Sequence, residues 1–139
     1  MKITFFGAGY VGLVSAACFA EVGHSVLCVD RNKEKIDSLV LGKVPFYEKG
    51  LKSLLHQGLD SNRLRFSTNL IEGISFGDLI FIAVDTPPKN DGSANLNNIM
   101  EVATTIGQEI CDYKIVVIKS TVPAGTSSRI RTVIQDQLA

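Results

Sequence analysis

Residues 7–12, GAGYVG, have the glycine spacing G-x-G-x-x-G, which is typical of loops that bind the pyrophosphate of a dinucleotide. Gly7 permits a tight turn, Gly9 lets the backbone approach a phosphate without an intervening Cβ atom, and Gly12 allows close packing of the next helix. Phosphates at this loop would meet backbone N–H groups and the positive end of a helix dipole. The same glycines also fit a turn without a ligand, so the flanking elements decide the interpretation.

Asp30 stands at the end of the second predicted strand, where a carboxylate can accept hydrogen bonds from the adenosine ribose of a dinucleotide. The same carboxylate repels a 2′-phosphate, which favours NAD over NADP. Arg31 favours the opposite choice, because an arginine here can accommodate a 2′-phosphate. Asp30 could also cap the next helix. From its position alone, Lys35 is either a solvated residue or a cation near the adenosine, and we favour the solvated position.

Two loops follow later predicted strands. Residues 85–92, DTPPKNDG, place the hydroxyl of Thr86 near the expected pyrophosphate or nicotinamide ribose. Residues 120–126, STVPAGT, place hydroxyls, including that of Thr121, where the nicotinamide would extend. Each loop has a simpler interpretation, because Thr-Pro-Pro can merely end a strand and Ser or Thr can merely cap a helix.

Five runs rich in β-branched or aromatic residues predict strands: Lys2–Phe6, Val26–Asp30, Leu64–Ser67, Leu79–Val84 and Lys114–Lys119. Four are nearly continuous in apolar residues, as strands covered on both faces of a parallel sheet are. Leu64–Ser67 has a polar interruption and predicts an edge strand.

Helical periodicity appears between these runs. The predicted helices lie around residues 36–40, 51–58, 99–110 and 130–138, with a further, almost wholly apolar and therefore buried helix at Tyr10–Gly23. Alternating strands and helices predict an α/β fold, a doubly wound parallel (Rossmann) sheet in the order 3-2-1-4-5. We expect residues 1–139 to form one domain that lacks a sixth strand and belongs to something larger.

Composition excludes several classes of protein. Fourteen Lys and Arg balance fourteen Asp and Glu, so no basic surface is expected for nucleic acid or an anionic membrane. No apolar run approaches the ~20 residues of a membrane span, and a cytoplasmic protein is expected. Cys18, Cys28 and Cys111 are too far apart in sequence for a metal site or disulfide framework. We expect them to be small apolar core residues, and we expect no metal.

Four segments, in this order, resemble the N-terminal domain of the UDP-glucose/GDP-mannose dehydrogenase family. They are KITFFGAGYVGLV (Lys2–Val14), VPFYEKGL (Val44–Leu51), FIAVDTPPKNDGSANL (Phe81–Leu96) and STVPAGT (Ser120–Thr126). The glycine loop is shared by many dehydrogenases, but the other three segments are more specific. The resemblance therefore covers the whole chain.

The resemblance implies two-step oxidation of a sugar nucleotide's primary alcohol to a carboxylate, with NAD as cofactor and a cysteine thioester as intermediate. By motif, it implies NAD contacts at Gly7, Gly9, Tyr10, Val11, Gly12, Asp30, Lys35, Thr86 and Thr121. Thr121 is also similar to a threonine that helps hold a catalytic water. The catalytic cysteine, the other catalytic residues and the nucleotide-sugar domain lie outside this sequence, so the chain is expected to bind cofactor without turnover. The full-length protein is expected to be a homo-oligomer.

Two residues depart from the family pattern: Asp85 replaces a usual Gly and Lys49 a usual Pro. A carboxylate at position 85 would crowd the pyrophosphate if it pointed inward. Three alternatives stay open. The substrate could be GDP-mannose or an N-acetylated UDP-sugar, the chain could be a free-standing NAD-sensing domain, or it could belong to a hydroxyacid dehydrogenase. A sensor has no reason to carry VPFYEKGL or STVPAGT.

Overall fold

The structure is a computed structural model and describes residues 1–138. Five strands form one sheet in the order β3-β2-β1-β4-β5, and every neighbouring pair is parallel. Their bounds are β1 Lys2–Phe6, β2 Ser25–Val29, β3 Leu64–Ser67, β4 Leu79–Ile82 and β5 Ile115–Ile118. The predicted fold class and strand order are therefore confirmed. Three strands end one or two residues earlier than predicted, so Asp30 follows β2 rather than closing it.

Six helices cover the sheet: α1 Tyr10–Glu21, α2 Lys33–Val40, α3 Leu51–Asp60, α4 Leu70–Phe76, α5 Asn97–Glu109 and α6 Thr126–Leu138. The helix α4 is absent from the sequence prediction. It is attached to the central strand by Thr4, a fully buried residue whose hydroxyl donates to the carbonyl of Gly73 at 2.6 Å. At the C-terminal end of α4, Lys114 Nζ donates to the carbonyl of Gly77 at 2.7 Å.

Two apolar cores lie on opposite faces of the sheet. The first packs α1, α2 and α3 against side chains such as Phe5 and Cys28. The second packs α4, α5 and α6 against alternate residues of the same strands, such as Phe6 and Val29. Neighbouring residues of a strand point to opposite faces. Near-continuous apolar strands are thus explained by burial on both sides.

Two burial predictions need correction. The helix α1 is not buried all round, because Tyr10 is 55% and Val11 45% exposed, and Cys18 faces solvent. The sheet covers only one side of the helix, and its other side carries this exposed set. Cys111 is also exposed, so only Cys28 is the buried core thiol that was predicted.

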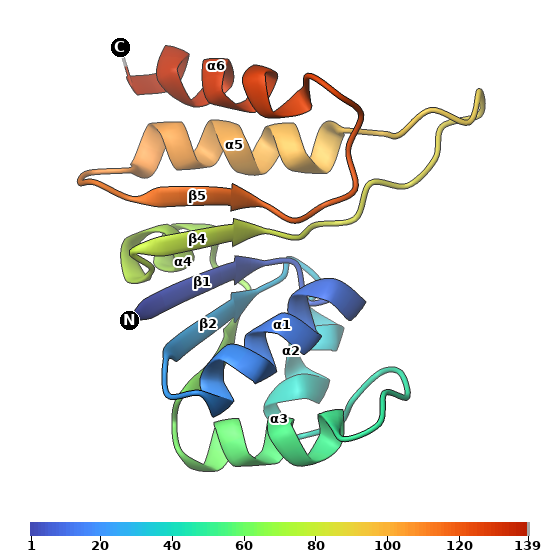
Figure 1. Cartoon of the computed structure of the whole chain (residues 1–139), viewed down its shortest axis with the longest axis vertical. Coiled ribbons are helices and arrows are strands. Elements are labelled where there is room, and N and C mark those ends of the chain that lie inside the picture. Colours follow the sequence, from blue (N-terminus) through green and yellow to red (C-terminus); the bar gives the residue numbers. More distant parts are fainter. Residues whose placement is uncertain (139) are drawn as a thin grey trace.

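All five strands run in the same direction, so their carboxyl ends meet at one edge of the sheet (Figure 1). The turn after β1, the segment after β2 and the loops after β4 and β5 all leave from this edge. The loop after β4 projects well beyond the sheet in the same view. The candidate residues therefore gather at one edge because the topology brings their loops there.

Candidate cofactor site

The glycine loop turns sharply between β1 and α1. Gly7 has φ +107°, and a Cβ atom there would lie 2.4 Å from the carbonyl oxygen of Ala83, so a side chain at this position is excluded. A Cβ atom on Gly12 would lie 1.9 Å from the carbonyl oxygen of Gly7. The tight turn predicted at Gly7 is thus confirmed, and the close approach at Gly12 is mainly to the loop itself rather than to the strand.

Asp30 fixes this loop from the neighbouring strand. Its Oδ2 accepts a hydrogen bond from the backbone N–H of Ala8 at 2.9 Å, and its Oδ1 accepts one from the N–H of Asn32 at 2.9 Å. A carboxylate has about four acceptor positions, so Asp30 can still receive a ligand hydroxyl. Asp30 is not the N-cap of α2, because Asn32 caps that helix through the N–H of Lys35.

Lys35 lies beside this carboxylate rather than on a solvated face. Its Nζ is 3.5 Å from Asp30 Oδ2, and its side chain is three-quarters buried. The position-based expectation of a solvated Lys35 was therefore wrong, and the NAD contact implied for it by the resemblance stays a prediction. Arg31 does not pair with Asp30, because its guanidinium lies 3.0 Å from Glu101 of α5.

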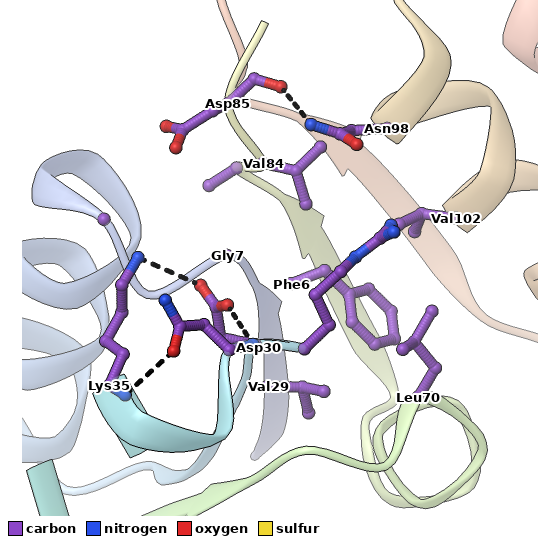
Figure 2. A pocket seen from close by; sticks show the side chains of 14 residues that line it. Phe6, Gly7, Val29, Asp30, Lys35, Leu70, Val84, Asp85, Asn98 and Val102 are labelled. Atoms are coloured by element: carbon purple, nitrogen blue, oxygen red, sulfur yellow. Dashed lines mark hydrogen bonds and ion pairs between the residues drawn. The ribbon is translucent and has the colours of Figure 1, made fainter. Parts of the chain in front are cut away.

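These groups line one pocket at the carboxyl edge of the sheet (Figure 2). Asp30 and Lys35 stand on one side of it, and Leu70 and Val102 on the other. Apolar walls combined with a few polar groups are typical of sites for small molecules. The full lining is Phe6, Gly7, Gly9, Val29, Asp30, Arg31, Asn32, Lys35, Leu70, Ala83, Val84, Asp85, Asn98 and Val102.

Thr86 and Thr121 lie outside this lining but contact one another. The hydroxyl of Thr86 donates to the backbone carbonyl of Thr121 at 3.0 Å. Beside them, the hydroxyl of Ser120 donates to the carbonyl of Val84 at 2.7 Å. The loops after β4 and β5 are thus joined, and Ser120 links strand ends rather than capping a helix.

Tyr10 has a contact that sequence reasoning missed. Its hydroxyl donates to Glu48 Oε2 at 2.5 Å, and its ring lies 5.3 Å from that of Phe46, centroid to centroid. The hydrogen bond and the charge of Glu48 raise the pKa of the Tyr10 phenol. The first residue of α1 is thereby attached to the segment of residues 41–50, which carries Lys49. Val11, the next residue, is half exposed at the same end of α1.

The carboxylate of Asp85 lies close to Gly9 of the glycine loop. Figure 2 shows Asp85 among the residues that line the pocket. A Cβ atom on Gly9 would lie 3.5 Å from Asp85 Oδ1. The backbone carbonyl of Asp85 accepts a hydrogen bond from the side-chain amide of Asn98 at 3.2 Å, which attaches this loop to α5. The inward orientation considered for this carboxylate is the one observed.

The whole chain, residues 1–139, matches the UDP-glucose/GDP-mannose dehydrogenase family, NAD binding domain. The chain belongs to this family. It is 48% identical, over its full length, to UDP-glucose 6-dehydrogenase of Pseudomonas aeruginosa, of which it covers 31%. NAD is therefore the cofactor of this domain, and the family is one of oxidoreductases.

Solved structures agree with the fold. The chain superposes on GDP-mannose dehydrogenase of Pseudomonas aeruginosa with a TM-score of 0.94 at 39% identity, covering 99% of this chain and 32% of that one. A UDP-glucose dehydrogenase of the archaeon Pyrobaculum islandicum gives 0.92 at 37% identity, with coverages of 99% and 33%. The chain thus spans about a third of the length of its relatives.

Residues 1–138 contain neither a membrane-spanning helix nor a metal-binding cluster. No helix in this part of the chain is long and apolar enough to cross a membrane. Within the same residues, no three His, Cys, Asp or Glu side chains are grouped so that they could hold a metal ion.

Proposed function

We propose that residues 1–139 are the cofactor domain of an enzyme that oxidises UDP-glucose to UDP-glucuronate with two NAD per substrate. The 48% identity to a UDP-glucose 6-dehydrogenase supports this substrate. The catalytic cysteine of the thioester route belongs to a part of the protein outside this sequence. The domain alone is therefore expected to bind NAD without turnover, in a full-length protein that is a homo-oligomer.

The observation that carries the cofactor assignment is the position of Asp30. Its carboxylate both holds the glycine loop through Ala8 N–H and lies in the pocket, with acceptor capacity left over. Asp30 would accept a ribose hydroxyl, and Lys35 would be the cation near the adenosine. Gly7, Gly9 and Gly12 would give the pyrophosphate access to the start of α1.

The remaining assigned contacts would act further along the dinucleotide. Tyr10 and Val11 begin α1 beside the expected pyrophosphate, and both are exposed on the free chain. Thr86 and Thr121, joined by their hydrogen bond, would position the nicotinamide end. Bound NAD would supply the hydride acceptor for both oxidations. Thr121 would in addition help to hold the water that attacks the thioester.

Other nucleotide sugars are the second candidate substrates, because the chain is also 39% identical to a GDP-mannose dehydrogenase. The assay that separates them is NADH formation by the full-length protein with UDP-glucose, GDP-mannose or UDP-N-acetylmannosamine. The proposal expects two NADH per UDP-glucose and slower turnover of the others. Faster turnover of either alternative would replace UDP-glucose as the substrate.

Calorimetric titration of the chain with NAD and NADP tests the site. We expect saturable NAD binding, poorer NADP binding, and an NAD affinity at least about tenfold lower in Asp30→Ala, because a hydrogen bond to a charged group is lost. The matched control is Asp37→Ala, which removes an exposed carboxylate of α2. Equal NAD affinity in the Asp30 and Asp37 variants would contradict the assignment.

A further inference from the structure

Two ion pairs lie on opposite sides of the pocket. On the α2 side, Lys35 Nζ lies 3.5 Å from Asp30 Oδ2. On the α5 side, Arg31 Nη2 lies 3.0 Å from Glu101 Oε2, although the two residues are 70 positions apart in sequence. The Arg31–Glu101 pair joins the segment after β2 to α5, and both of these segments line the pocket.

Arg31 is the residue that left the choice between NAD and NADP ambiguous. An arginine next to the acidic residue can accommodate a 2′-phosphate in such a site, because its planar guanidinium can bind phosphate oxygens in pairs. Here that guanidinium is turned toward Glu101. The two cations of the pocket, Arg31 and Lys35, are therefore each paired with a carboxylate.

We propose that Glu101 is a specificity-determining residue, which holds Arg31 on the α5 side of the pocket and so disfavours NADP. The inference rests on the proposed position of the adenosine ribose at Asp30. Asp30 selects NAD by accepting a hydrogen bond from the 2′-hydroxyl. Glu101 acts by a different route, since it occupies the cation that a 2′-phosphate would need. NAD has no charge at that position and needs no cation there.

The solvent exposure of the Arg31–Glu101 pair limits its contribution to the stability of the fold. The side chains of Arg31 and Glu101 are 52% and 58% exposed, so the pair adds little to the stability of the fold. A 2′-phosphate carries nearly two negative charges and needs a cation that is free to bind it. Removing Glu101 should therefore leave the fold intact while it frees Arg31 for the phosphate.

The test is titration of the chain with NAD and with NADP after Glu101→Gln, with Glu101→Ala as a second variant. We expect the ratio of the NADP and NAD dissociation constants to fall about threefold, because freeing Arg31 can gain no more than the exposed Arg31–Glu101 pair contributes. The control Asp37→Asn makes the same change in net charge at the exposed Lys33–Asp37 pair and should leave the ratio unchanged.

Arg31→Ala completes a double-mutant cycle. Alone it should leave NADP binding poor, and combined with Glu101→Gln it should abolish the gain. An unchanged ratio in both Glu101 variants, an equal gain in Asp37→Asn, or a gain that persists without Arg31 would each overturn the inference. If the wild-type chain binds NAD, such a result leaves the proposed function intact. If it binds neither dinucleotide, the proposed function fails and this inference fails with it.

Discussion

At the scale of single residues, the charged side chain of Asp85 beside the glycine loop bears on cofactor binding. Asp85 brings a carboxylate to within van der Waals range of a Cβ atom built on Gly9, where the backbone is otherwise free to approach a pyrophosphate. Like charges at short range disfavour binding, and exposure to solvent reduces the effect. We therefore expect Asp85 to weaken, rather than block, the approach of the phosphates.

Replacing Asp85 by Asn should tighten NAD binding by about threefold, because a screened like-charge repulsion of this kind is a fraction of a kcal/mol. Titration of the two proteins at low and high salt measures it, and the difference should shrink as salt rises. Asp91→Asn, in the same loop, is the control that removes a carboxylate further along the chain. Weaker NAD binding by Asp85→Asn would show that this carboxylate helps the cofactor instead.

Cys28 should be the one unreactive thiol of the native chain. Burial, aided by the negative charge of Asp30, raises the pKa of the Cys28 thiol well above its usual range. The neutral thiol thus favours folding at pH values below about 8.5, and this contribution is lost only as the pH rises above that value.

Iodoacetamide at pH 8, followed by mass spectrometry, should modify Cys18 and Cys111 rapidly. Modification of Cys28 should require unfolding, and equal rates at all three would contradict its burial.

At the scale of elements, the segment of residues 41–50 is attached to α1 by Tyr10. The hydroxyl of Tyr10 contacts Glu48, and its ring contacts Phe46. The segment lies between α2 and α3 and contains no helix or strand of its own. Side-chain contacts of this kind are therefore what positions it beside the glycine loop.

Tyr10→Phe should loosen this segment without unfolding the chain, because only one exposed hydrogen bond is lost. We expect trypsin to cleave after Lys43 and Lys49 about threefold faster. Tyr47→Phe removes the same hydroxyl from a side chain that is 89% exposed, and it should not change the rate. If both variants were cleaved at the wild-type rate, packing of Phe46 alone would account for the position of the segment.

The sequence predicted the long-range arrangement of elements better than their short-range details. Strand order followed from apolar runs alternating with helices, a pattern that survives errors of one or two residues at each end. The helix α4 was not predicted, because Leu70–Phe76 is too short to show a helical periodicity of apolar residues. Its signal was local: Asn69 caps the helix, accepting from the N–H groups of Ile71 and Glu72.

The candidate site also has a part that the sequence predicts and a part that it does not. The positions of Gly7, Gly9 and Asp30 at the pocket could be predicted, because the motif specifies both the residue types and the strand or helix that each one flanks. The contacts of Arg31 with Glu101 and of Tyr10 with Glu48 could not, because each joins segments whose separation in sequence carries no pattern. Side-chain packing, rather than periodicity, decides such pairs.

At the scale of the whole molecule, the interior strand β1 is better protected than the strands at the edges of the sheet. It lies between β2 and β4, and four of its five residues are buried. By contrast, β5 lies at the edge of the described sheet, and Ile115 is 50% exposed. Burial and pairing on both sides raise the free energy of local opening.

Amide hydrogen exchange of the chain should therefore be much slower in β1 than in β5. Peptide-level mass spectrometry after labelling for minutes to hours measures both in one sample. The other edge strand, β3, serves as an internal control and should exchange faster than β1. Comparable protection of β5 and β1 would indicate that another chain pairs with that edge in solution.

The pocket also has a consequence for how the two faces of the sheet unfold. Gly9 and Lys35 come from the side of α1 and α2, whereas Leu70 and Val102 come from helices of the opposite layer. A molecule that fills the pocket must touch both layers, so its binding free energy is lost when either one opens. Bound cofactor would then link the two helical layers that pack on opposite faces of the sheet. The domain would unfold more cooperatively with NAD than without it.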